Sequence, residues 1–191
     1  MEKTHSDIVA LLHSVSVNSD EPSYRQLFDI FYPPLERFSR CLVGSRELAE
    51  EAASDAMIAL WEQRQRLMEI ENVRVWLFVI ARNKCLNMLR HQESRATLPL
   101  HPGSIDISLT GSDPEQICIN SEMRKKMEKA VNGLPPRCKL IFKLVKEEGL
   151  SYKEVADILH ISSKTVDAQL VTALRKIAQI GRASCRERVS V

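Results

Sequence analysis

The chain has 191 residues, 44% of them hydrophobic and 27% charged, which suggests one or two domains at about 100 residues each. Aromatic residues make up only 5% and there are 6 glycines, so a β-sandwich or a barrel is disfavoured. No apolar run reaches the roughly 18 residues that span a membrane. The first residues also lack the charged and apolar regions of a signal peptide, so we expect a cytoplasmic protein.

The two ends of the chain are set apart from the predicted fold. Residues 1–20 are expected to form an N-terminal tail. Residues 180–191 resemble a translated sequencing-adapter read-through, and we predict a non-native tail there. Without its three Arg and one Glu, the 27 basic and 25 acidic residues balance, and the formal net charge of +2 becomes zero.

Residues 47–62 are predicted to form an acidic helix, because they carry five carboxylates and no cation. One narrow face of this helix is made of small apolar residues that allow close packing on a neighbour. The opposite face carries Glu51, Asp55, Ile58 and Glu62. An apolar residue among carboxylates suits a protein-docking patch, and an ordinary solvated face fits the composition equally well.

Residues 72–92 are predicted to form a second long helix, with cations and no acidic residue. This segment is apolar almost all round, which is typical of a helix at the centre of its bundle. Trp76 and Phe78 are therefore interpreted as core residues in preference to base-stacking platforms. Cations and amides at the exposed margins could follow a nucleic-acid strand. These candidates are Asn72, Arg74, Arg82, Asn83 and Lys84.

The opposite charges of these two helices indicate two different partners. Residues 94–114, rich in Pro, Gly and Ser, are predicted to be a flexible linker. A second helical unit is expected over residues 115–179, with a break at Pro135 and Pro136. The sequence thus predicts an all-α fold of two small helical domains joined by a linker.

Residues 149–177 have the pattern of a helix-turn-helix. Ser151 and Glu154 form a capping box that begins the first helix. Apolar residues of this helix recur at helical spacing at Tyr152, Val155, Ala156 and Leu159. Ser162 and Ser163 are candidate caps of the second helix, whose apolar stripe is Val166, Leu170, Ala173, Leu174 and Ile177.

The side of the second helix opposite this stripe carries groove-reading chemistry. Its cations can pair with phosphates or guanine edges, its hydroxyls can hydrogen-bond to DNA, and its small apolar residues suit thymine methyls. The alternative is a solvated helix hairpin whose polar residues simply face water. The candidate DNA-binding residues are Ser163, Lys164, Thr165, Ala168, Val171, Thr172 and Arg175.

No pattern of residues indicates an enzyme, a metal site or a cofactor. Cys41, Cys85, Cys118 and Cys138 are scattered, without a Cys-x-x-Cys pair or a histidine at ligand spacing. We interpret them as buried thiols and expect no catalytic residue, no metal ligand and no cofactor.

Three blocks in order resemble the extracytoplasmic-function group of the sigma-70 family of bacterial RNA polymerase sigma factors. Residues 28–61 are similar to the family's region 2, and Trp76–Asn83 with Asn87–Arg90 to its promoter-melting helix. Leu134–Arg137 and the helix-turn-helix are similar to region 4. The resemblance covers residues 21–179 and implies region 2 over 21–93 and region 4 over 115–179.

The resemblance implies a transcription initiation subunit without covalent chemistry of its own. Glu51, Asp55, Ile58 and Glu62 would dock on the polymerase clamp, and the second unit would approach the flap. Asn83 and its neighbours would engage the unpaired minus-10 strand, beside a pocket for a flipped base near residues 67–72. Residues 162–176 would read the minus-35 duplex in the major groove. The family also implies an anti-sigma factor, which can be membrane-tethered.

A helix-turn-helix regulator of the response-regulator type is the alternative, because its final helix pair has a very similar pattern. Such a regulator acts without replacing sigma and needs an α/β receiver ahead of the helix-turn-helix. Residues 1–120 have helical periods and no alternating strands, which argues against a receiver.

Overall fold

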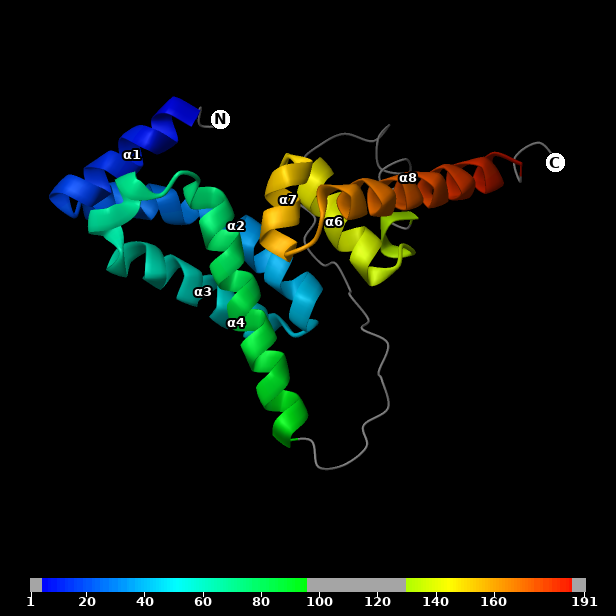
Figure 1. The fold of residues 1–191 in the computed structure, drawn as a ribbon, viewed down its shortest axis with the longest axis horizontal. Helices are drawn as coiled ribbons and strands as arrows, with labels where there is room; N and C mark the ends of the chain where they lie inside the picture. The colour runs from blue at the N-terminus through cyan, green and yellow to red at the C-terminus, as the bar shows by residue number, and fades with distance from the viewer. Residues whose placement is uncertain (1–4, 96–129, 187–191) are drawn as a thin grey trace. The chain divides into compact units, whose positions relative to one another are not determined.

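The computed structural model describes residues 5–95 and 130–186, and the regular structure in these ranges is entirely helical (Figure 1). The chain divides into two compact units. The first is built from the elements up to Arg95, and the second mainly from those after residue 130. Two small helical domains are therefore confirmed, whereas the predicted linker lies almost wholly outside the described residues.

The first unit contains four α-helices and a 3₁₀ helix in its described part. Helices α2, α3 and α4 pack against one another in pairs, and α1 packs on α2 and η1. The central side chains include Phe38 and Phe78, which meet edge to face with ring centroids 5.1 Å apart. The elements are α1 (His5–Asn18), α2 (Glu21–Val43), α3 (Arg46–Glu62), η1 (Arg64–Glu69) and α4 (Val73–Arg95).

The N-terminal segment differs from its prediction as a tail. Residues 5–18 form α1, and its Leu12 and Val15 are buried, with Val15 fully excluded from solvent. Serines interrupt the apolar residues of α1, so its sequence shows no long helical stripe. Burial against η1 and α2 supplies the stabilisation that such a short helix lacks on its own.

Side-chain caps fix the beginnings of α2 and α3. Asp20 accepts a hydrogen bond from the backbone N–H of Ser23 at 2.9 Å, and Ser45 accepts one from the N–H of Leu48 at 3.3 Å. Helix α2 ends at Gly44, whose φ of 70° is a conformation that glycine adopts without strain. These signals set the turn between α2 and α3.

The small-residue face predicted on α3 is confirmed. Its alanines have no solvent exposure, and the absence of longer side chains lets α3 lie close to α2 and α4. The opposite face of α3 is thereby turned to solvent. The buried alanines are Ala49, Ala52, Ala53 and Ala56.

In its described part, the second unit contains α6 (Pro136–Lys146), α7 (Tyr152–Leu159) and α8 (Ser163–Arg186), and residues 130–132 before them are also helical. Its core joins residues of α6 and α8 with Val131 and Leu134, which precede α6. Helix α8 runs past the boundary predicted at residue 179. In the described ranges, no helix has both the length and the hydropathy needed to cross a bilayer. The core cluster is Val131, Leu134, Cys138, Phe142, Leu170 and Ala173.

Candidate functional site

The predicted helix-turn-helix is present as α7, a short turn and α8. The capping box of α7 is reciprocal, with the N–H of Ser151 donating to Glu154 Oε2 at 2.7 Å and the N–H of Glu154 donating to Ser151 Oγ at 3.3 Å. The turn passes through His160 at a φ of 52°, a left-handed conformation. Ser162 then caps α8 by accepting from the N–H of Thr165 at 3.1 Å.

The exposed side of α8 carries the residues predicted to read DNA. Lys164, Ala168, Val171 and Arg175 are exposed and lie within about 60° of one another around the helix, and we call them the reading face. Val171 exposes 46% of its surface, unusually much for an apolar residue next to cations. Ser163 is exposed at the beginning of the same helix.

The two threonines of α8 are less available than the reading face. The hydroxyl of Thr172 donates to the carbonyl oxygen of Ala168 at 2.8 Å, which leaves this oxygen as an acceptor for a ligand. The hydroxyl of Thr165 lies 2.8 Å from that of Ser162 and takes part in the cap. Both side chains therefore stabilise the helix that presents the reading face.

Two residues placed in the apolar stripes are exposed in the structure. Tyr152 exposes 40% and Leu174 45% of its surface, so these two members of the predicted stripes are not part of the core. Val155 is fully buried on α7, and Ala173 fills the position beside Leu174 on α8. Each buried stripe is therefore narrower than the spacing alone predicts.

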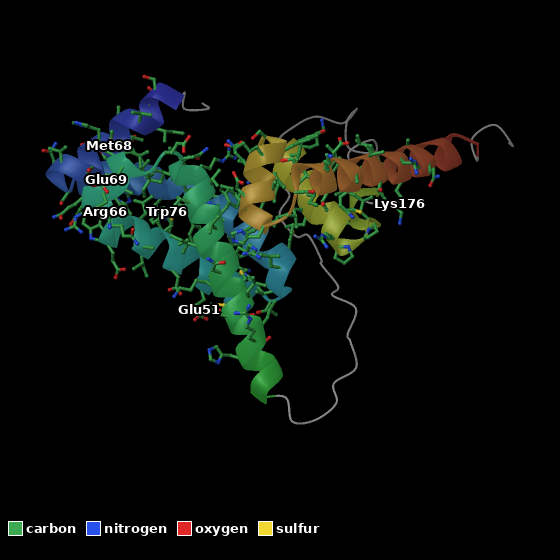
Figure 2. All side chains as sticks on the ribbon, in the orientation of Figure 1. Glu51, Arg66, Met68, Glu69, Trp76 and Lys176 are labelled. Atoms are coloured by element: carbon green, nitrogen blue, oxygen red, sulfur yellow. The ribbon has the colours of Figure 1, made fainter. Side chains whose placement is uncertain are left out.

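On α4, Asn72 begins the helix by accepting a hydrogen bond at Oδ1 from the N–H of Val75, at 3.1 Å. Asn83 lies on the solvent side, and Arg82 Nη1 donates to its Oδ1 at 3.2 Å. Arg74 is partly buried near the beginning of the helix. Of the two aromatic residues, Phe78 is confirmed as core at 1% exposure, whereas Trp76 is only partly buried (Figure 2).

Lys84 lies apart from the other candidates on α4. Its Nζ is 2.9 Å from Asp55 Oδ2 on α3. The pKa of Lys84 is raised, first by the hydrogen bond with Asp55, then by the charge of Asp55 and more weakly by Glu51 and Glu62. These three carboxylates, which we call the acidic surface, therefore stabilise the charged form of the cation that the sequence assigned to a nucleic-acid strand.

The other candidates on α3 are accessible. Glu51 and Glu62 are exposed, and Figure 2 shows Glu51 on the outer side of its helix. Ile58 exposes 52% of its surface among these carboxylates. The structure thus places all four predicted docking residues on the solvent side of α3, opposite its buried alanines.

An open groove that the sequence did not predict adjoins this surface. It has a volume of about 900 Å³ and lies between the beginning of α2 and the end of α3. Tyr24 and Trp61 meet across it edge to face, with centroids 5.0 Å apart, and the Tyr24 hydroxyl donates to the carbonyl of Met57 at 3.0 Å. The groove is lined by Glu21, Pro22, Tyr24, Arg25, Phe28, Asp29, Ile58 and Trp61.

Two signals in the sequence point to this groove in retrospect. Tyr24 and Phe28 are one helical turn apart, and Ile58 and Trp61 are similarly spaced on α3. Such pairs are usually assigned to the core, and only the packing of α2 on α3 reveals that these side chains border a groove.

The cysteines of the described ranges fit the interpretation as buried thiols in part. Cys85 and Cys138 are buried, and Cys41 is partly buried. Burial raises the pKa of the Cys85 thiol, which lowers the fraction of reactive thiolate. Cys118 lies outside the described residues.

Two protein-family models match the chain. The model described as Sigma-70 region 2 matches residues 27–95, and the model described as Sigma-70, region 4 matches residues 124–177. The chain belongs to the sigma-70 family of RNA polymerase sigma factors. The helices that carry the acidic surface and α4 lie in the first match, and the helix-turn-helix lies in the second.

Curated relatives place this sigma factor in the extracytoplasmic-function group. It is 25% identical over 178 residues to the ECF RNA polymerase sigma factor RpoE of Cereibacter sphaeroides, covering 91% of this chain and 94% of the relative. It is 24% identical over 179 residues to the ECF RNA polymerase sigma factor SigM of Mycobacterium tuberculosis, covering 94% and 85%.

Solved structures share the fold of this sigma factor. The sigma factor RpoE of Bartonella quintana, solved with the anti-sigma factor NepR, has a TM-score of 0.59 at 19% identity, covering 83% of this chain and 96% of that one. CnrH, solved with the cytosolic domain of CnrY, has a TM-score of 0.55 at 17% identity, covering 94% and 99%.

Proposed function

We propose that this sigma factor docks on core RNA polymerase through α3, reads a minus-35 element as duplex with α8, and engages the unpaired minus-10 strand with α4. The observation that carries the proposal is the reading face of α8, two cations and two small apolar residues exposed together behind a capped turn. We infer that the protein acts in the cytoplasm, catalyses no covalent step of its own and uses no cofactor.

The reading face suits the major groove of duplex DNA. Lys164 and Arg175 can contact phosphates or guanine edges, and Arg can do so through two parallel hydrogen bonds. Ala168 and Val171 offer apolar contact to thymine methyl groups. A helix docked by its N-terminal half, as helix-turn-helix proteins dock, would also bring Ser163 to a phosphate.

On α4, the geometry favours Arg82 and Asn83 as the contacts to the single strand. At about 100° per residue, Asn83 points away from the buried side of the helix. Arg82 and Lys84 lie about 160° apart around the helix by the same geometry, so one strand cannot follow both from a single side. By this geometry Asn72 lies about 20° from Asn83 and extends the candidate surface to the beginning of α4, whereas Arg74 lies about 180° from Asn83 and about 80° from Arg82. Lys84 belongs with the acidic surface instead.

The acidic surface and the groove form a docking site for a helical partner that carries cations beside an apolar stripe. Ile58 lines the groove and is exposed among the carboxylates of the acidic surface, which makes it the centre of such an interface. We propose the clamp of core polymerase as this partner and the flap as the partner of the second unit. The sigma factor RpoE of Bartonella quintana was solved in complex with an anti-sigma factor. We propose that an anti-sigma factor, which can be membrane-tethered, also binds this chain and competes for such surfaces.

In-vitro transcription with bacterial core polymerase tests the proposal. A version of the chain that ends at Gln179 and the full chain are each assayed on a library of random promoters. We expect run-off products that share a two-part motif, absent when the sigma factor is omitted. Duplex binding without any transcript would instead indicate a regulator that acts without replacing sigma.

A further inference from the structure

Arg64 joins three segments of the first unit through one side chain. Its Nε donates to Ser19 Oγ at 2.9 Å, in the connection between α1 and α2. Its Nη1 donates to the carbonyl oxygen of Trp61 at 2.9 Å, at the end of α3. Its guanidinium also lies over the Trp61 ring, 4.7 Å from the centroid.

The segment that begins at Arg64 leads directly to the proposed minus-10 surface. Helix η1 contains Leu67, which is 1% exposed and anchors the segment, so the pocket expected at residues 67–72 cannot include this side chain. Only Ile70, Glu71 and Asn72 separate η1 from α4, and Asn72 caps α4. The 70–72 connection is thus fixed at both ends. Leu67 and Arg64 fix it on the η1 side, and the Asn72 cap fixes it at the beginning of α4.

Helix α1 completes this support. It packs on η1 and on α2, and Ser19, which follows it, adopts a φ of 51° that few residues other than glycine, asparagine and aspartate tolerate. This conformation places the Ser19 hydroxyl where Arg64 reaches it. A planar guanidinium can satisfy both acceptors and the aromatic ring at once, which a lysine ammonium cannot do.

Arg64 itself does not line the docking groove. Trp61 lines the groove, whereas Arg64 and Ser19 do not. Arg66, two residues further along η1, pairs only locally with Glu69 at 3.0 Å, and its side chain is 74% exposed (Figure 2). Arg64 and Arg66 therefore have the same charge on the same short helix but different structural roles.

We infer that Arg64 is a positioning residue for promoter recognition. It fixes the beginning of η1 against α1 and α3, and through η1 it sets the 70–72 connection and the capped start of α4 against the unpaired strand. The inference rests on the proposed minus-10 role of α4. It assigns to Arg64 no contact with DNA and no contact with polymerase.

The experiment compares Arg64→Ala, Arg64→Lys and the control Arg66→Ala in the full chain with core polymerase. Each variant is assayed on promoters randomised across the minus-10 element, as intact duplex and as premelted templates. Core affinity, circular dichroism and the salt dependence of DNA binding are measured in parallel. Ser19→Gly removes only the acceptor for Nε while keeping the left-handed backbone favourable.

We expect Arg64→Ala to lower discrimination between bases at one or more minus-10 positions by about tenfold, the effect of one mismatched base pair. The helical content of this variant should match that of wild type, and its affinity for core polymerase should stay within about twofold. The salt slope of its DNA binding should not change. Arg64→Lys should resemble Arg64→Ala, Ser19→Gly should give a smaller loss in the same direction, and Arg66→Ala should match wild type.

Three results would overturn the inference. If Arg64→Ala and Ser19→Gly both retain discrimination between bases of the minus-10 element, the contacts of Arg64 do not position the promoter-binding surface. Full rescue by Arg64→Lys together with a smaller salt slope in Arg64→Ala would show direct contact with a phosphate. Equal losses in Arg66→Ala would assign the effect to charge. Absence of promoter-specific products with the wild-type chain would instead contradict the proposed function itself.

Discussion

Lys84 of α4 and Asp55 of α3 form an ion pair, with 2.9 Å between Nζ and Oδ2. Along the sequence, the acids of residues 47–62 and the cations of residues 72–92 are separate, and they predicted two surfaces for two partners. The fold brings the edges of these two surfaces together. Charge segregation in the sequence is therefore not the same as charge segregation on the surface.

This pair leads to a prediction about which cation binds the DNA strand. Arg82→Gln should reduce the salt slope of minus-10 strand binding by about 0.7, the value for one phosphate of a single strand. Lys84→Gln should leave the slope unchanged, because Lys84 faces Asp55 on the other side of α4. Affinity for a fluorescent single strand, measured in the holoenzyme at several salt concentrations, checks both.

The same variants show whether the pair matters for folding. An exposed ion pair contributes at most about 1 kcal/mol, so Lys84→Gln should barely change the free energy of unfolding. If the salt slope of minus-10 strand binding is instead lower in Lys84→Gln than in Arg82→Gln, Lys84 belongs to the strand-binding surface.

A second prediction concerns the reading face of α8. Lys164→Ala and Arg175→Ala should each weaken duplex minus-35 binding and reduce its salt slope by about 0.9 if the contact is to one phosphate. If either residue reads a base, the loss should be about 1–3 kcal/mol at a single promoter position. Binding to a series of promoter duplexes separates the two outcomes.

Lys176 provides the matched control on the same helix. It is exposed next to Arg175 but lies about 100° further around α8, away from the reading face (Figure 2). Lys176→Ala should keep both the affinity and the salt slope of the wild type. A loss as large as that of Arg175→Ala would show that binding depends on net charge and not on this face.

Much of the fold follows from local signals. The capping box of α7, the break at Pro135 and Pro136, and the alanine face of α3 are each fixed by neighbouring residues, so short-range rules predict them. The exposed half of α8 was likewise predictable, since one stripe of apolar residues determines where the opposite side faces.

The remaining features depend on packing between elements that are distant in sequence. Helix α1 is stabilised by η1, some 45 residues away, as the Arg64–Ser19 hydrogen bond illustrates. The groove needs α2 and α3 together, and the partner of Lys84 lies on another helix. Periodicity within one helix contains no information about such pairings, so α1 and the groove were missed and the ion pair of Lys84 with Asp55 was not foreseen.

A third prediction tests the close packing of α3. Ala53 is fully buried, so Ala53→Leu forces extra volume between helices and should destabilise the first unit by about 1–3 kcal/mol. Glu51→Leu, on the exposed side of the same helix, should change the free energy of unfolding by less than about 0.5 kcal/mol. Urea denaturation followed by circular dichroism measures both. Equal effects would mean that the alanine face is not tightly packed in solution.

A fourth prediction concerns pH. The pKa of Asp20 is lowered from 3.8, mainly by hydrogen bonds from the hydroxyl and the N–H of Ser23. The stabilisation by this ionised cap is therefore present above pH 3.8 and lost as pH falls through the lower pKa of the folded state. Asp20→Asn keeps a capping oxygen without this titration.

The free energies of unfolding of wild type and Asp20→Asn should differ by a constant amount above about pH 5, where Asp20 is ionised in both the folded and the unfolded state. The difference should shrink as pH falls through and below 3.8. Denaturation curves from pH 6 down to the acid limit of folding, at constant ionic strength, provide the measurement. A difference that does not vary with pH would remove Asp20 from the acid sensitivity of the protein.

The last prediction concerns the docking site. Ile58 and Met68 each expose 52% of their surface, but Ile58 borders the groove on α3 whereas Met68 lies on η1 outside it. Ile58→Glu should lower the affinity for core polymerase by about tenfold or more, because it places a charge at the apolar centre of the interface. Met68→Glu should leave that affinity unchanged, although both variants add the same charge at equal exposure. Fluorescence anisotropy of labelled sigma factor titrated with core polymerase measures the dissociation constants of the two variants. Equal affinities would exclude the groove and its acidic surface as the docking site.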